Sequence, residues 1–209
     1  MLVLNLCQQL CPEKIPLHIK PERLGDGADG EVFELDNEPD KVIKFCILYD
    51  TGSQGLRRTY KYISNTLNYL IREPSLAYAH VYTHMYLGEW FRSVVWGNTH
   101  KQQKYLLYYY TMEKLFRIST DEQKVFHTIL SNEDRGIKKN FAHDKLKEML
   151  AGLRKGLDFD IERVIFFDDI LKKTPLAHLD LHPRNIMKDK SGDYKLIDFD
   201  RCELLPGNT

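Results

Sequence analysis

The chain has 209 residues, with 30 basic and 30 acidic side chains, and 43% of its residues are hydrophobic. This length suits one ordinary domain or two small lobes that share a cleft, and the composition argues against general disorder. A formal net charge of zero gives no attraction to nucleic acid or to an anionic membrane, so we expect neither as a partner. No apolar run approaches the roughly 20 residues that cross a bilayer, and the four cysteines are typical of free thiols in the cytoplasm.

The first half of the chain predicts strands. Glycines punctuate residues 24–35, which end in a β-type run, and a cluster of turn residues follows at 36–40. Residues 42–47 are apolar except at Lys44, which predicts a strand buried on both faces. A helical pattern then occupies residues 55–72 and ends before a proline.

Two further strands are predicted at residues 91–96 and 104–112, around a polar turn, and the state of residues 75–90 is left open. The second half predicts three helices. The first begins with a capping box of Thr120 and Gln123. The second has an apolar stripe at helical spacing, formed by Leu146, Met149, Leu150, Leu153 and Leu157.

The third helix should run over residues 160–173 and stop at a proline, with two lysines at the negative end of its dipole. Residues 186–199 then predict a small β-hairpin. The sequence therefore divides into a strand-rich part, residues 1–115, and a helical part, residues 116–209.

The motif Gly25-x-Gly27-x-x-Gly30-x-Val32 is the first candidate for function. Glycine lets the backbone approach phosphate oxygens and point N–H groups at them. The alternatives are a glycine-rich turn without function, or a dinucleotide-binding unit, in which a helix follows the glycines directly. Here a β-type run follows, which favours a β-hairpin that covers phosphates.

Lys44 is the second candidate, because an ammonium inside an apolar strand is costly unless it meets an anion. The alternative is an edge-strand lysine that reaches solvent. The third candidate is the run from His178 to Asn185 together with Asp198, which offers a base at Asp180 and hard oxygen ligands for Mg²⁺. Turn-forming Asp and Asn residues are the alternative for each one singly.

The ordered set of a glycine-rich loop, a strand lysine, His-x-Asp-Leu-x-x-x-Asn and Asp-Phe-x resembles the protein-kinase-like superfamily. This resemblance implies an α+β, two-lobed fold, with an N-terminal antiparallel β-sheet lobe that binds ATP and a reduced helical C-terminal catalytic lobe. It also implies a hinge in residues 107–115, with the adenine of ATP against Met112 and Lys114.

The resemblance assigns a role to each matching residue. Gly25, Gly27, Gly30 and Val32 would cover the nucleotide, Lys44 would hold the α- and β-phosphates, Asp180 would take the acceptor's proton, and Asn185 and Asp198 would hold Mg²⁺. For the acidic partner of Lys44 we favour Glu73, with Glu89 and then Asp50 as alternatives.

The sequence also departs from the superfamily. Leu179 replaces the arginine that reads a phosphorylated activation loop, His182 makes the loop similar to those of aminoglycoside and choline kinases, and Asp200 replaces the glycine of Asp-Phe-Gly. Few residues follow, so the peptide-seating segment of larger kinases is absent. We expect either a minimal kinase or a fragment, with a partner chain that completes the truncated lobe as a further alternative. Its similarity to small bacterial effector and phage kinases adds the host cytoplasm as an alternative location.

The function expected from the sequence is an Mg·ATP-dependent kinase of protein hydroxyl groups, with Ser/Thr favoured over Tyr. A small-molecule kinase is the first alternative. A nucleotide-binding pseudokinase that acts through a partner is the second, and transfer of AMP in place of phosphate stays open.

Overall fold

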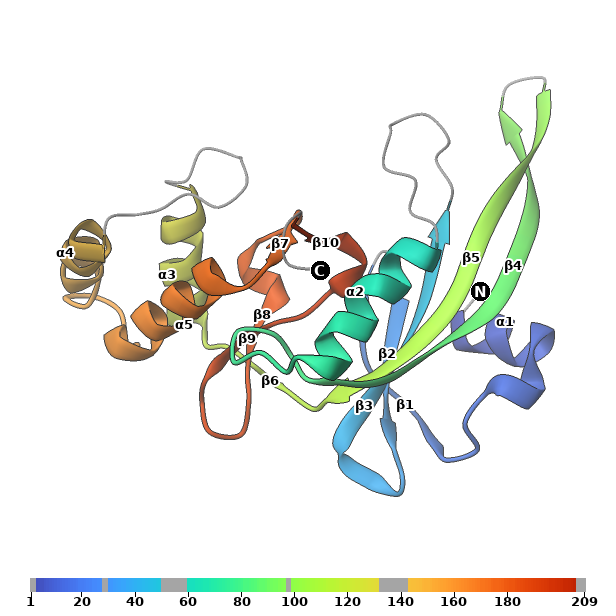
Figure 1. Ribbon diagram of the computed structural model, residues 1–209, viewed down its shortest axis with the longest axis horizontal. Coiled ribbons are helices and arrows are strands. Elements are labelled where there is room, and N and C mark those ends of the chain that lie inside the picture. The colour runs from blue at the N-terminus through green and yellow to red at the C-terminus, as the bar shows by residue number, and fades with distance from the viewer. Residues whose placement is uncertain (1–2, 28–29, 50–59, 97–98, 132–142, 206–209) are drawn as a thin grey trace. The chain divides into compact units, whose positions relative to one another are not determined.

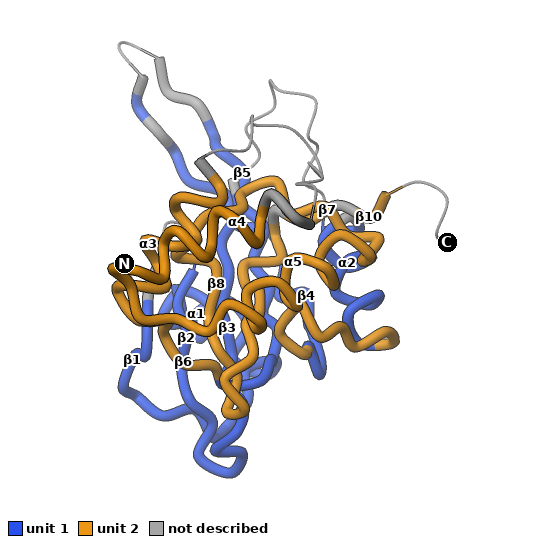
Figure 2. The backbone as a smooth tube through the Cα atoms, turned by 90° about the vertical axis from the view of Figure 1, so that its left-hand side faces the viewer, with its two compact units in different colours: residues 1–71, 81–114 blue, residues 72–80, 115–209 orange. Residues whose placement is uncertain are grey.

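The structure is a computed structural model, and it describes residues 3–27, 30–49, 60–96, 99–131 and 143–205 (Figure 1). The chain divides into two compact units, coloured separately in Figure 2. Unit 1 contains residues 1–71 and 81–114, and unit 2 contains residues 72–80 and 115–209. Among the described residues, no helix has both the length and the apolar content to cross a membrane.

Unit 1 is built on an antiparallel sheet of five strands in the order β1-β2-β3-β5-β4. Its elements along the chain are α1 (Val3–Leu10), η1 (Pro12–Lys14), β1 (Ile19–Gly27), β2 (Gly30–Leu35), β3 (Glu38–Tyr49), α2 (Tyr60–Arg72), β4 (Val81–Trp96) and β5 (Thr99–Glu113). β4 and β5 extend farther than the predicted strands, because they pair from Val81 to Trp96, with register shifts between Val81 and Thr83 and between Tyr86 and Gly88. The predicted start of the helix at residue 55 lies outside the described residues, and its end at Arg72 is confirmed.

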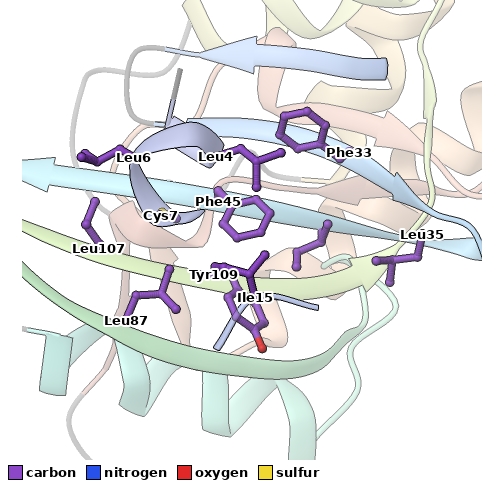
Figure 3. Packing of buried hydrophobic residues seen from close by; sticks show 11 residues of the cluster. Leu4, Leu6, Cys7, Ile15, Phe33, Leu35, Phe45, Leu87, Leu107 and Tyr109 are labelled. Carbon is purple, nitrogen blue, oxygen red and sulfur yellow. The ribbon is translucent and has the colours of Figure 1, made fainter. Parts of the chain in front are cut away.

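Side chains of successive strand residues point to opposite sides of this sheet. Helices cover both sides. On one face α1 contributes Leu4, Leu6 and Cys7 to a buried cluster that includes Phe45 and Tyr109, as Figure 3 shows. Burial raises the pKa of the Cys7 thiol to about 12, so it stays protonated at neutral pH. Two-sided burial explains why the central strand β3 has apolar residues on both faces.

The other face of the sheet packs against α2. The ring of Tyr60, at the start of this helix, stacks on Tyr86 with a centroid distance of 4.5 Å. Its hydroxyl lies 2.7 Å from Nδ1 of His84, and its ring is tilted against Tyr108 at 5.9 Å. Tyr108 therefore faces α2, whereas its neighbour Tyr109 faces α1.

One buried carboxylate anchors α1 to the sheet. The backbone N–H of Leu4, in the first turn of α1, donates to Oε2 of Glu31 at 3.1 Å. Arg23 on β1 donates to the other carboxylate oxygen at 3.2 Å. Since the first N–H groups of a helix have no partner within the helix, Glu31 satisfies one of them and complements the positive end of the dipole.

In its described residues, unit 2 has three α-helices and two small sheets. Its elements are β6 (Phe116–Arg117), α3 (Thr120–Ser131), α4 (His143–Leu153), α5 (Ile161–Lys173), β7 (Leu176–His178), η2 (Pro183–Asn185), β8 (Ile186–Lys188), β9 (Tyr194–Leu196), η3 (Phe199–Arg201) and β10 (Cys202–Leu204). One sheet has the order β6-β8-β9, and β7 pairs with β10 in the other. The predicted hairpin is therefore present as β8 and β9.

Two predicted helix boundaries in unit 2 are wrong: the start of α3 and the end of α4. The capping box of α3 is formed by Ser119 and Glu122, not by Thr120 and Gln123: Glu122 accepts from Ser119 N at 2.8 Å, and Ser119 Oγ accepts from Glu122 N at 3.2 Å. Leu157 belongs to the segment after α4, which ends at Leu153. The third helix agrees with its prediction, because Asp160 caps it by accepting from the N–H groups of residues 162 and 163.

Glu122 has a second role inside unit 2. Its Oε1 accepts from the Tyr194 hydroxyl at 2.5 Å and forms an ion pair with Lys188. The Tyr194 ring packs edge-on against Phe126 and Phe167, at 4.9 and 6.1 Å. The buried glutamate therefore ties α3 to the β8–β9 hairpin.

Residues 72–80 group with unit 2, although the division by sequence places them in the first part. The reason is a pair of backbone hydrogen bonds, from Ala79 N to Leu196 O at 2.9 Å and from Leu196 N to Ala77 O at 2.8 Å. Tyr78 is fully buried there and donates to Leu176 O at 3.2 Å. With antiparallel strands in unit 1 and helices in unit 2, the predicted α+β class is confirmed.

The anchor of α1 gives a test of the core of unit 1. Replacing Glu31 by Ala leaves Leu4 N and Arg23 without their acceptor, so we expect the free energy of unfolding to fall by about 1–3 kcal/mol. Urea denaturation measures this loss, and Glu22→Ala, at an exposed position of β1, is the control. Equal effects of the two substitutions would contradict the anchor.

Candidate active site

In unit 1 the glycine motif forms a β-hairpin. Gly25 pairs with Val32 and Gly27 pairs with Gly30, across β1 and β2, and the two residues of the turn lie outside the described part. The strand β2 follows directly, as expected for a hairpin and not for a dinucleotide-binding helix.

The three glycines are not equivalent. A Cβ atom on Gly30 would lie 2.5 Å from the carbonyl oxygen of Phe45 and 3.2 Å from Cε of Lys44. A Cβ on Gly25 would meet nothing within 4 Å. Gly30 is therefore required for the close approach of β2 to β3, and Gly25 presents open backbone.

Lys44 lies at the centre of the sheet, opposite Val32 on β2 and Tyr110 on β5. It alternates with Phe45, so its side chain belongs to the face that α2 covers, away from α1. Its ammonium lies 5.8 Å from the centre of the Tyr110 ring. The strand therefore holds this cation at a half-buried position next to Gly30.

The acidic partner of Lys44 stays a prediction. Glu89 forms an ion pair with Lys104 on the neighbouring strand. Glu73 belongs to unit 2, and Asp50 lies outside the described residues. The preference for Glu73 over Glu89 and Asp50 stays a prediction from the sequence.

Of the two predicted hinge residues, Met112 lies near the end of β5 and Lys114 follows the strand. Met112 is buried between Val42 and Val81. Lys114 donates its backbone N–H to Asp40 O at 2.8 Å, and its ammonium pairs with Glu34. Hydrogen bonds from Lys114 and Lys20 lower the pKa of the Glu34 carboxyl to about 2. Any role of Lys114 toward a nucleotide therefore falls to its backbone carbonyl.

In unit 2 a single imidazole joins the two predicted catalytic segments. Nε2 of His178 lies 2.8 Å from Ile197 O, and Nδ1 accepts from the backbone N–H of Asp180 at 3.3 Å. Because a carbonyl oxygen only accepts, the proton is on Nε2 and the ring is neutral. Burial lowers the pKa of His178 below its ordinary value, although the carbonyl of Ile197 and the nearby carboxylates oppose this shift. His178 thus fixes the loop that carries Asp180 beside the segment that carries Asp198.

A second link orients Asn185. Its side-chain Nδ2 donates to Asp180 O at 2.9 Å, and its backbone carbonyl accepts from Ile197 N at 2.9 Å. Because the side chain is buried, this hydrogen bond fixes the orientation of its amide group. The donated Nδ2 leaves Oδ1 as the atom for a cation.

Asp198 has an unusual backbone, with φ 72° and ψ 62°. Among the described residues it is the one other than glycine with positive φ. This left-handed conformation costs energy for a side chain with a Cβ, and such strain is concentrated at functional sites. Asp200, two residues later, is buried in η3.

Asn185 and Asp198 fit a magnesium ion. An amide oxygen and a carboxylate are hard ligands, and Mg²⁺ in phosphate-binding sites uses one or two protein oxygens together with waters and the phosphates themselves. Within the described ranges, no three His, Cys, Asp or Glu side chains come together as a metal site. The donor types of Asn185 and Asp198 are those that Mg²⁺ uses when it binds together with phosphates.

Sequence reasoning missed two residues of this framework. Ile197 contributes through its backbone to both His178 and Asn185, which no residue type can indicate. Glu122 fixes the hairpin after Asn185, and the pattern Ser119-x-x-Glu122 could have identified it as a cap.

No protein-family model matches the sequence, and no curated protein matches it. Among solved structures, the chain is similar to "ROP18 kinase domain in complex with AMP-PNP and sucrose", with 15% sequence identity and a TM-score of 0.45. The match covers 87% of this chain and 51% of that chain, so the chain spans about half the length of the solved structure. A likeness of this strength carries no information on substrate or activity.

The glycine hairpin gives a matched pair of substitutions. Gly30→Ala pushes a methyl group against the Phe45 carbonyl, so we expect the free energy of unfolding to fall by about 1–3 kcal/mol. Gly25→Ala, with nothing in reach, should change it by less than about 0.5 kcal/mol. Thermal and urea unfolding measure both, and a similar loss in the two variants would contradict the packing described.

The state of His178 is open to NMR. We expect its ring to be neutral at pH 7, protonated on Nε2, with a pKa below the ordinary 6.5. Since this pKa is depressed, the unfolded chain binds the proton more readily, and the stability that the neutral ring contributes is lost as the pH falls below about 6.5. Nitrogen-15 shifts of labelled histidine report both the tautomer and the pKa, with the urea-unfolded chain as reference. An imidazolium at pH 7, or a proton on Nδ1, would contradict the link.

Proposed function

We propose that the chain is an Mg·ATP-dependent kinase that transfers the γ-phosphate of ATP to a protein hydroxyl group, with serine or threonine favoured. The observation that carries this proposal is the framework in unit 2, where His178 links the backbone of Asp180 to that of Ile197, next to Asp198, and Asn185 donates to Asp180 O. It supports phosphoryl transfer because that reaction needs positioned groups and cations more than covalent help.

In the proposed reaction, the oxygen of the acceptor hydroxyl attacks the γ-phosphorus. The bond from this phosphorus to the β,γ-bridging oxygen breaks, and ADP leaves. Asp180, whose side chain is about a third exposed at 36%, receives or orients the proton of the hydroxyl. Exposure matters here, because the acceptor must reach this carboxylate from solvent.

The proposed nucleotide contacts follow the resemblance residue by residue. In unit 1 the backbone of Gly25, Gly27 and Gly30, with Val32, would cover the phosphates, and Lys44 would neutralise the α- and β-phosphates. Asn185 Oδ1 and the Asp198 carboxylate would hold Mg²⁺. When bound, Mg²⁺ neutralises charge on the phosphate oxygens.

A small-molecule kinase shares all of these steps and differs in the acceptor. His182, which is similar to the histidine of aminoglycoside kinases, favours this second function. Incubation with ATP and a panel of aminoglycosides and metabolites, read out as ATP consumption, separates it from a protein kinase. The intact mass of the product separates phosphate transfer from AMP transfer.

The central substitution is Asp180→Ala, because it removes the proposed proton acceptor and leaves the metal ligands in place. We expect turnover to fall by about 10²–10⁴-fold, while calorimetry still detects Mg·ATP binding. Transfer of labelled phosphate from ATP to protein in a cell lysate measures turnover.

Two further variants sharpen this result. Asp198→Asn weakens a metal ligand and should reduce magnesium-dependent nucleotide binding, whereas Glu148→Gln, on the exposed side of α4, should change neither binding nor turnover. No labelled protein from wild-type material that binds ATP would argue against a protein kinase. Unchanged turnover in Asp180→Ala would remove Asp180 from the mechanism.

A further inference from the structure

Beside Asp180, unit 2 has a second feature that the proposed mechanism does not use. A hollow of about 600 Å³ opens between helix α3 and the short turn η2. It is lined by Thr120, Gln123, Lys124, His127, Thr128, His182, Pro183 and Arg184, which we call the α3–η2 groove. A hollow of this size accommodates a few side chains of an extended segment.

The lining of the groove has one sign of charge. It contains Lys124 and Arg184, with His127 and His182, and it contains no acidic side chain. Two carboxylates lie at its border: Asp121 pairs with Lys124 at 3.1 Å, and Asp180 lies 4.0 Å from His182. Asp121 is shared, because it also accepts the backbone N–H of residue 158 at 3.2 Å, and Lys124 stays more than half exposed at 59%.

Arg184 is the cation of the groove on which the inference depends most. Its backbone N–H donates to Nδ1 of His182 at 3.0 Å, and Pro183 starts the turn, so both neighbours fix its backbone. Within the described part of the chain, its guanidinium has no hydrogen bond or ion pair, and the same holds for the ring of His127. Guanidinium groups bind carboxylates and phosphates in a bidentate manner, so this position suits an anionic side chain.

The groove is also continuous with the proposed base. His182 belongs to its lining and at the same time approaches the Asp180 carboxylate, so the groove begins next to the point where a hydroxyl would be held. A protein segment with its hydroxyl at Asp180 would place its neighbouring residues over Lys124 and Arg184.

We propose that the α3–η2 groove selects acceptor segments that carry an acidic or phosphorylated side chain beside the accepting hydroxyl. This inference rests on the proposed function and specifies its substrate class. Cationic acceptors would meet like charge in the groove, which disfavours basic peptides and aminoglycosides as acceptors. The α3–η2 groove therefore favours a protein acceptor over an aminoglycoside.

Binding in the absence of nucleotide tests this inference without phosphate transfer. The probes are fluorescent peptides with one central serine, identical except that the serine is flanked by glutamate, phosphoserine, glutamine or lysine. We expect the glutamate and phosphoserine peptides to bind at least about tenfold more tightly than the lysine peptide, with glutamine between them. Fluorescence anisotropy measures each dissociation constant, and an aminoglycoside serves as a competing cation.

Charge reversal assigns the preference to the groove. Arg184→Glu and Lys124→Glu should each reduce the preference for anionic over cationic peptides by about tenfold. Lys155→Glu, an exposed lysine outside the groove, has the same change of charge and should leave the preference unaltered. The position of Lys124 on the surface of α3 keeps the test valid if the Arg184 variant fails to fold, which thermal melting reports.

The outcomes separate the inference from the function on which it rests. The inference is overturned if all four peptides bind equally, or if the aminoglycoside binds more tightly than the anionic peptides. Either result overturns it even if the wild-type protein phosphorylates serine. A second outcome is that anionic peptides bind more tightly and both charge reversals remove this preference, but the protein transfers no phosphate to any peptide. This outcome upholds the groove as an anion site and overturns the kinase function. Anionic preference together with phosphorylation of the same peptides supports both.

Discussion

The geometry of unit 2 depends on one neutral imidazole between two chain segments. Because His178 donates from Nε2 and accepts at Nδ1, it joins Ile197 O to Asp180 N, and both groups lie next to a carboxylate of the proposed site. Protonation of the ring would remove the acceptor and place a cation where burial opposes it. The same loop is held again by the amide of Asn185, so its backbone is fixed before any ligand binds. Preorganisation of this kind is what electrostatic catalysis requires, since groups that are already in place cost no reorganisation during the reaction.

Unit 1 shows how packing sets the place of a charged residue. Its sheet is covered on both faces, by α1 around Phe45 and by α2 around Tyr108, which leaves few positions for a lysine. Lys44 occupies one of them, beside a glycine whose missing Cβ lets two strands approach closely. Similar logic applies at Lys114, whose ammonium is taken by Glu34, so that the end of β5 is fixed by an ion pair within unit 1.

Much of this could be predicted from the sequence, because the signals are local. Alternation and glycine spacing predict the β1–β2 hairpin, and the apolar run around Lys44 predicts β3. A helix boundary is harder to predict: the pattern Thr120-x-x-Gln123 predicts one capping box for α3, and the structure has the neighbouring one, Ser119 with Glu122. The two sequence patterns differ by one residue, and only the burial of Glu122 against Tyr194 decides between them.

Other features have no local signal. The grouping of residues 72–80 with unit 2 depends on backbone hydrogen bonds to Leu196, more than a hundred residues later. The positive φ of Asp198 and the charge of the α3–η2 groove are likewise consequences of tertiary structure, because they arise where distant segments meet. Residue types can therefore indicate which groups do chemistry, whereas their positioning partners come from the fold.

The central claim is that a strand lysine and two oxygen ligands act on one triphosphate. The most direct measurement is a crystal structure with a non-hydrolysable ATP analogue and Mg²⁺. The account predicts Lys44 Nζ at hydrogen-bonding distance from the α- or β-phosphate, with Asn185 Oδ1 and the Asp198 carboxylate about 2.1 Å from the metal. A nucleotide bound elsewhere, or a metal that neither Asn185 nor Asp198 contacts, would contradict it.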